Sequence, residues 1–282
     1  MSSPIDLITD PADVRIASYR EVRDGRVRHA GLFLAEGRLV VRRLLESRFT
    51  VRSVMATRAV LDDLADALDK RPSVQRYEAS PETIRAVVGF KFHRGCLALG
   101  EEGPGTPARA IIQPSGSRLV LGLEDVTDPD NVGAVFRNAA AFGAAGIVLS
   151  PGCADPLYRK SIRVSMGATL TIPFATTGWS DGLGALRDAG YTLVALTPHP
   201  DAQSLDAVAG GLRSRRLAVL LGAEGGGLGD EARRTADLRV RIPMTPGVDS
   251  LNVATACAIA LHRLADLARP GDARSMMDGD PS

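Results

Sequence analysis

The stretch LVLGLEDVTDPDNVGAVFRNAAAFG, residues 119–143, carries the clearest signal for the fold. It opens with a short apolar run, which is typical of a buried strand. An acidic turn follows, and apolar residues then recur at helical spacing. Asp130 or Asn131 can cap this helix, and Gly143 can close it in a left-handed conformation. The stretch therefore predicts a strand, a polar loop and a helix in succession.

Four further apolar runs follow along the chain, with helical segments between them. They cover residues 146–149, 192–196, 217–221 and 238–242. This alternation predicts a mainly parallel α/β sheet covered by helices. Ligands bind such sheets at the loops beyond the carboxyl ends of the strands.

The part of the chain before residue 101 predicts a smaller α/β unit. Its expected strands are 32–35, 51–56, 74–77 and 96–99, and its expected helices are 37–47 and 61–70. Residues 101–117 hold three prolines and three glycines and predict an interdomain linker. The predicted organisation is an N-terminal domain (1–100), the linker (101–117), a second domain (118–270) and a frayed tail (271–282).

Composition excludes several classes of protein. With 45% apolar and 24% charged residues among 282, the chain has the balance of a globular protein. The apolar stretch Val253–Leu261 is too short to cross a bilayer, and no secretion signal is present, so we expect a cytoplasmic protein. The three cysteines and four histidines lack the spacing of a disulfide framework or a metal site, so no metal is expected.

Charge is distributed unevenly between the two halves. Residues 1–110 contain eighteen basic and fifteen acidic residues, while the remainder contains sixteen and eighteen. A mild basic excess in the first part permits an RNA-facing surface without requiring one.

A second informative stretch is LAVLLGAEGGGLG, residues 217–229, an apolar strand that runs into a glycine-dense turn. Such a turn brings bare backbone close to a ligand. It is not a dinucleotide fingerprint, because Glu224 stands two residues after Gly222, and the chain lacks a triphosphate-binding loop. The glycines alone could form a loose connection, but Glu224 among them favours a binding site.

The third stretch is VRIPMTPGVDSLNVATA, residues 240–256, which predicts a strand, a proline-fixed loop and a helix. Ser250 is a plausible N-cap, and Asn252 could serve either the cap or a substrate. Arg137, in the first stretch, is either a solvated helix charge or a group that holds RNA phosphate or ribose.

Together the three stretches resemble the motifs of the SpoU/TrmH branch of the SPOUT methyltransferases, in matching order and spacing. The family patterns N-x-G-x-x-x-R, G-x-E-x-x-G-L, I-P-M and S-L-N-V are matched by Asn131, Gly133 and Arg137, by Gly222, Glu224, Gly227 and Leu228, and by residues 242–244 and 250–253. Residues 165–168 also resemble the S-x-G-A segment of the family.

This resemblance implies a C-terminal α/β domain with a deep trefoil knot and a homodimer whose interface helps to build the active site. Residues 15–99 resemble, more weakly, a ribosomal-protein-L30e-like RNA-binding domain. The H-Q-G of that domain reads His93-Arg94-Gly95 here, which puts a role for the glutamine in doubt.

The resemblance also implies the activity, which is 2′-O-ribose methylation of structured RNA, with 23S ribosomal RNA as the expected substrate and S-adenosylmethionine as cofactor. Residues matched to cofactor binding are Leu196, Thr197, Gly222, Ile242, Met244 and Leu251, and those matched to catalysis are Arg137, Asn131, Glu224 and Asn252. Arginine is not deprotonated in proteins, which makes Arg137 a poor base. We therefore expect Arg137 to fix phosphate and stabilise the developing alkoxide, and the general base stays unassigned.

Two alternatives remain open at this point. The RNA could be tRNA, although tRNA-directed members usually lack the N-terminal domain. The chain could instead be a non-catalytic RNA-binding or ribosome-assembly factor, against which the intact Arg137, Glu224 and Asn252 argue.

Overall fold

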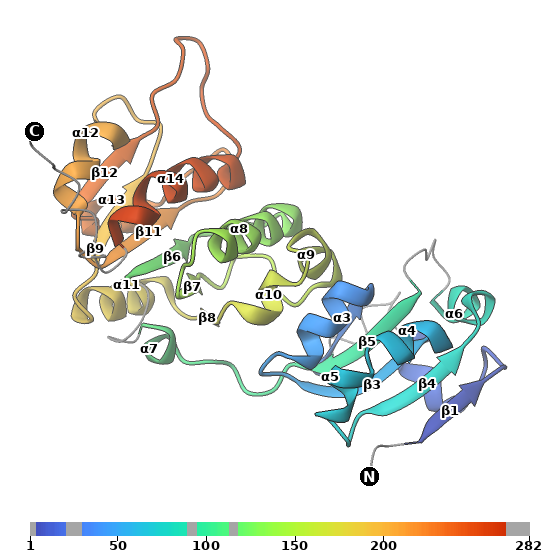
Figure 1. Cartoon of the computed structure of the whole chain (residues 1–282). Coiled ribbons are helices and arrows are strands. Elements are labelled where there is room, and N and C mark those ends of the chain that lie inside the picture. Colours follow the sequence, from blue (N-terminus) through green and yellow to red (C-terminus); the bar gives the residue numbers. More distant parts are fainter. Residues whose placement is uncertain (1–3, 21–29, 89–94, 113–117, 269–282) are drawn as a thin grey trace, which may run out of the picture. The chain divides into compact units, whose positions relative to one another are not determined.

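The computed structural model describes residues 4–20, 30–88, 95–112 and 118–268 (Figure 1). Contacts divide the chain into two compact units. The first contains Met1–Gly105, Asp128–Arg137 and Ala154–Pro173, and the second contains Thr106–Thr127, Asn138–Cys153 and Phe174–Ser282. Parts of the predicted 118–270 domain thus occur in both units. His93, Arg94 and the tail 271–282 lie outside the described residues.

The first unit contains a five-stranded sheet with the order β1-β4-β3-β5-β2. Its strands are β1 (Ile5–Ile8), β2 (Leu32–Glu36), β3 (Thr50–Ala56), β4 (Gln75–Ala79) and β5 (Cys96–Glu101). β1, β4 and β3 run parallel, whereas β5 is antiparallel to both of its neighbours. The four expected strands are present within one or two residues, and β1 was not predicted.

The helices of this unit are short. They are α1 (Ala17–Arg20), α3 (Arg38–Leu45), α4 (Arg58–Asp63), α5 (Ala65–Asp69), α6 (Pro81–Val88), α9 (Arg159–Val164) and α10 (Ala168–Thr171), with the 3-10 turn η1 (Val14–Ile16). The single helix expected at 61–70 is wrong. Leu64 has φ −97° and ψ 3°, outside the α-helical region, and it divides the segment into α4 and α5.

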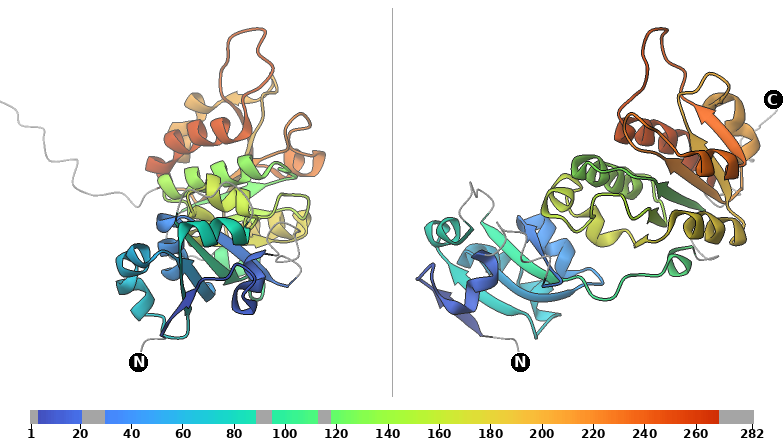
Figure 2. Two further views of the ribbon diagram at one scale, coloured as in Figure 1. Left: turned by 90° about the vertical axis from the view of Figure 1, so that its right-hand side faces the viewer. Right: turned by 180° about the vertical axis from the view of Figure 1, so that it is seen from behind.

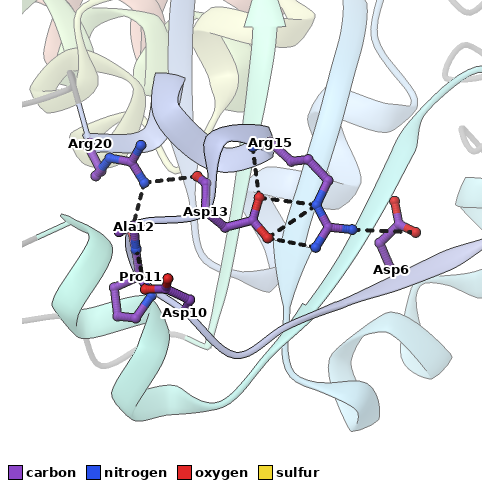
Figure 3. A network of polar contacts seen from close by, with 7 residues as sticks. All are labelled: Asp6, Asp10, Pro11, Ala12, Asp13, Arg15 and Arg20. Carbon is purple, nitrogen blue, oxygen red and sulfur yellow. Dashed lines mark hydrogen bonds and ion pairs between the residues drawn. The ribbon is translucent and has the colours of Figure 1, made fainter.

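The turn after β1 is held by a polar network (Figure 3). Asp13 accepts a hydrogen bond from the backbone nitrogen of Arg15 at 2.9 Å and pairs with its guanidinium at 2.6 Å. Arg20 donates to the carbonyl oxygens of Pro11 and Asp13. The hydrogen bond from Arg15 is the main cause that lowers the pKa of Asp13 to about 2.

The second unit contains a seven-stranded sheet with the order β10-β12-β9-β11-β6-β7-β8, and all its described pairings are parallel. The strands are β6 (Leu119–Leu123), β7 (Gly146–Leu149), β8 (Phe174–Thr176), β9 (Thr192–Leu196), β10 (Gln203–Ser204), β11 (Leu217–Leu221) and β12 (Leu238–Arg241). The predicted α/β fold with a mainly parallel sheet is confirmed. Sequence patterns missed β8 and β10, which are only three and two residues long.

Helices and loops cover this sheet on both faces, since every residue of β6, β7 and β11 is buried (Figure 2). The helices are α7 (Ala108–Ile111), α11 (Trp179–Asp188), α12 (Leu205–Ala209), α13 (Asp230–Thr235), α14 (Val253–Ala268) and the 3-10 turn η3 (Gly210–Leu212). α8 (Pro129–Ala141) begins in the first unit and ends in the second. α7 falls inside the predicted linker.

The strand order decides where the loops meet. β12 pairs with β9 and β9 pairs with β11, so three strands far apart in sequence lie side by side. In a parallel sheet their carboxyl ends point to the same edge. The loops after Leu196, Leu221 and Arg241 therefore emerge together.

Among the described helices, none is both long enough and apolar enough to span a membrane. Cys96 and Cys257 are buried, and burial raises the pKa of each thiol to about 12. These two cysteines are therefore packing residues at neutral pH.

Candidate functional site

The second unit has a pocket at the carboxyl ends of β9, β11 and β12. Its volume is about 270 Å³, near the lower end of the roughly 300 to 1,000 Å³ typical of small-molecule sites. The lining comes from three loops and the start of α14: Leu196, Thr197, Pro198, Leu221, Gly222, Ala223, Glu224, Gly225, Gly227, Ile242, Met244, Ser250, Leu251, Asn252, Val253 and Ala256. All six residues expected to bind cofactor are in this lining, together with Glu224 and Asn252.

The loop after β11 folds back on itself at the wall of the pocket. Gly227 donates its backbone hydrogen to the carbonyl oxygen of Ala223 at 2.9 Å. A Cβ atom on Gly222 would lie only 2.2 Å from the carbonyl carbon of Gly227 and the nitrogen of Leu228. Glycine is required at this position because the two arms of the loop touch there, and the result is a wall of bare backbone.

Glu224 and Asn252 meet directly, although they come from different loops. The Asn252 Nδ2 atom donates a hydrogen bond of 3.1 Å to Oε1 of Glu224. Its Oδ1 atom accepts from the backbone nitrogens of Ala254 at 3.0 Å and Thr255 at 3.2 Å.

Asn252 is therefore the N-cap of α14, and the prediction that Ser250 caps this helix is wrong. α14 begins at Val253, so the capping position is residue 252, and Ser250 instead lines the pocket.

Glu124, which the sequence analysis did not single out, holds the end of the glycine loop at Gly229. Its Oε2 atom accepts a hydrogen bond of 2.8 Å from the backbone nitrogen of Gly229. Burial is the main cause that raises the pKa of Glu124, and the hydrogen bond from Gly229 opposes it. The sequence contained a usable signal, because an acid directly after a buried strand lies at the edge where ligands bind.

Asn138 fixes the beginning of α14 from another side. Its Nδ2 atom donates a hydrogen bond of 2.8 Å to the carbonyl oxygen of Ala254. This side chain therefore supports the helix that carries Asn252 at its start.

The remaining predicted catalytic residues, Asn131 and Arg137, belong to the first unit, on α8. Asn131 is buried, whereas Arg137 is exposed and, within the described part of the chain, its side chain forms no ion pair or hydrogen bond. The cap of α8 is neither Asp130 nor Asn131. Asp128 takes that role, because its Oδ1 atom accepts from the backbone nitrogen of Asp130 at 2.8 Å and Pro129 opens the helix.

Comparison with known proteins assigns the family. The model of the SpoU rRNA Methylase family matches residues 118–262, about half of the chain. The chain belongs to the SpoU rRNA methylase family. An uncharacterised tRNA/rRNA methyltransferase of Mycobacterium bovis is 41% identical over 261 residues, which cover 90% of both chains.

Two further relatives extend this comparison. The 23S rRNA (guanosine-2′-O-)-methyltransferase of Vibrio cholerae is 35% identical over 144 residues, 51% of this chain and 57% of its own. The crystal structure of an AdoMet-bound rRNA methyltransferase from Sinorhizobium meliloti superposes with a TM-score of 0.80 and 26% identity. The match covers 93% of this chain and 98% of that one.

Membership of the SpoU family confirms three predictions. The chain is an enzyme of the RNA 2′-O-methyltransferase class, it belongs to the SPOUT superfamily, and its cofactor is S-adenosylmethionine.

Proposed function

We propose that this chain transfers a methyl group from S-adenosylmethionine to a ribose 2′-hydroxyl of 23S ribosomal RNA. The observation that carries the proposal is the single pocket in which Leu196, Gly222 and Ile242, from three separate strand ends, line the same space beside Glu224. A concave space lined by apolar side chains and a few polar groups at the strand ends is typical of a small-molecule site.

The lining suits the chemical parts of S-adenosylmethionine. Leu196, Ile242 and Leu251 provide apolar surface for the adenine, and the bare backbone at Gly222 offers hydrogen bonds to its edge. The Glu224 carboxylate at the rim is suited to the positive charge of the ligand. When bound, the cofactor supplies an electrophilic methyl group on a sulfonium.

The residues of this chain then have to position the ribose and assist the loss of the proton from its 2′-hydroxyl. In our proposal, Arg137 binds the phosphate of the target nucleotide and stabilises the oxygen as it loses its proton. Asn131, Glu224 and Asn252 orient the ribose and the loops. The guanidinium stays protonated in proteins and does not take the proton itself.

The finer architecture is part of the same proposal. It comprises the trefoil knot, the homodimer, a cytoplasmic location and an RNA-binding domain of the ribosomal-protein-L30e type. The domain limits are 1–100, 101–117, 118–270 and 271–282. What supports these features is the resemblance in the motifs and the relatives named as rRNA methyltransferases.

The test is methyl transfer from labelled S-adenosylmethionine to purified 23S ribosomal RNA and, separately, to tRNA. The product is mapped by primer extension that stops at 2′-O-methyl groups. We expect a single stop in 23S RNA, lost in Arg137→Ala and kept in Arg187→Ala, which removes an exposed arginine of α11. Labelling of tRNA alone would transfer the proposal to that substrate. Cofactor binding without transfer to any RNA or ribosomal subunit would indicate a non-catalytic factor.

A further inference from the structure

The segment 154–173 is held firmly within the first unit. The Arg159 guanidinium pairs with Glu36 at 2.7 Å, and Glu36 is only 7% exposed. Arg43 donates a hydrogen bond of 2.7 Å to the carbonyl oxygen of Met166, in the S-x-G-A turn. These contacts from β2 and α3 hold the segment at two points, Arg159 and Met166.

The start of α8 holds the same segment from another side. Lys160 pairs with Asp130 at 2.9 Å. A Cβ atom on Gly133 would lie 2.7 Å from the carbonyl oxygen of Ser161, so α9 packs directly on the α8 backbone. α9 is therefore a rigid support beside the motif helix that carries Asn131.

One aromatic side chain projects from this support. Tyr158 is 49% exposed, while its neighbour Leu157 is 1% exposed and anchors the backbone. Within the described residues, every other phenylalanine, tyrosine and tryptophan is buried or half-buried. Among the described aromatic side chains, Tyr158 is thus the one that is exposed to solvent.

The short helix that follows Tyr158 is basic. α9 contains Arg159, Lys160 and Arg163 and no acidic residue. The first two pair with Glu36 and Asp130. Arg163 is exposed, and no ion pair or hydrogen bond to its side chain occurs in the part of the chain that the structure describes.

We infer that Tyr158 and Arg163 form a subsite for a single-stranded part of the RNA substrate. The ring stacks on an unpaired base and the guanidinium binds a backbone phosphate. Aromatic stacking combined with cationic side chains is how proteins hold unpaired nucleotides without reading their sequence. This inference rests on the proposed RNA methylation and names a site on α9 for its substrate.

The experiment compares full-length variants in steady-state methyl transfer to purified 23S ribosomal RNA. Loss of one stacked base weakens binding by about 5- to 150-fold, so we expect Tyr158→Ala to raise the KM for RNA within that range. Tyr158→Phe and Tyr158→Trp keep the ring and should keep the KM. Affinity for S-adenosylmethionine and the thermal midpoint should not change in any of the three.

The phosphate contact has its own readout. Arg163→Ala should weaken RNA binding and lower the slope of log affinity against log salt by about one, as expected for one lost phosphate contact. Arg187→Ala, which removes another exposed arginine, in the last turn of α11, should leave the slope unchanged.

The outcomes separate the two proposals. If the wild type methylates RNA and Tyr158→Ala has an unchanged KM, the subsite is wrong and the function stands. If Tyr158→Ala instead alters the molar mass in light scattering, the ring belongs to a contact with a second copy and the subsite is likewise wrong. A wild type that methylates neither 23S RNA nor tRNA overturns both proposals.

Discussion

The Asn252 side chain joins two parts of the pocket, because Nδ2 donates to Glu224 while Oδ1 caps α14. The glycine loop after β11 and the beginning of the last helix are therefore coupled through one amide. Asn252 thus contributes to helix stability through Oδ1 and to the pocket through Nδ2, and a suitable choice of variants can separate the two effects.

Asn252→Asp should keep the cap and break the contact with Glu224. The aspartate oxygen still accepts from Ala254 and Thr255, but two carboxylates now face each other. We expect a thermal midpoint close to the wild type and a loss of roughly tenfold or more in affinity for S-adenosylmethionine, since like charges repel. Calorimetric unfolding and titration calorimetry measure the two quantities.

Asn252→Ala removes the cap as well and should lower the free energy of unfolding by about 1 kcal/mol. Ser250→Ala is the matched control, because Ser250 does not cap the helix, and it should leave stability unchanged. A loss of stability in Ser250→Ala equal to that in Asn252→Ala would contradict the assignment of the cap.

Gly222→Ala should abolish tight cofactor binding. The new methyl group would lie 2.2 Å from the backbone of Gly227 and Leu228, so the loop must move. Overpacking of this kind costs about 1 to 3 kcal/mol, and here the displaced atoms form the pocket wall. Gly226→Ala is the control, since a Cβ there meets nothing within 4 Å. Equal affinities in the two variants, by titration calorimetry, would show that the loop is not a rigid wall.

Arg137→Lys should lower kcat by roughly 100-fold while stability and cofactor affinity stay at the wild-type level. The exposed guanidinium forms no ion pair or hydrogen bond among the described residues, so its replacement disturbs no internal contact. Lysine retains the charge but cannot bind phosphate in the bidentate manner. Single-turnover transfer measures the chemical step, and near-normal turnover in this variant would exclude the bidentate role.

Glu124 should make stability depend on pH. Burial raises its pKa above the ordinary glutamate value of 4.5, so the folded chain binds this proton more tightly than the unfolded chain does. Its favourable contribution is therefore fully present below pH 4.5 and is lost as pH rises through the folded pKa. Glu124→Gln keeps an acceptor for Gly229 and should remove this slope. Denaturant titrations of both proteins from pH 4.5 to 8 measure the difference, and parallel curves would show that Glu124 is not the cause.

The sequence determined the type of the main elements and the residues of the pocket. Five of the seven strands of the parallel sheet were predictable because apolar runs mark strands that are largely buried. The six residues expected to bind the cofactor were predictable from the resemblance of the motifs to the SpoU family, and all six line the pocket. Short edge strands such as β8 and β10 have too few residues to carry such a pattern.

Only the tertiary structure decided how the elements act on one another. The strand order that places β9 between β12 and β11 depends on pairings across the chain, which no local pattern encodes. The caps at Asp128 and Asn252 depend on where each helix begins, and nearby polar residues competed for both positions in the sequence. Glu124 gained its contact to Gly229, and Tyr158 its exposure, from packing with distant segments. The local spacing of apolar residues predicts which side of a helix or strand is buried. The residues that a side chain contacts depend instead on how distant segments of the chain pack together.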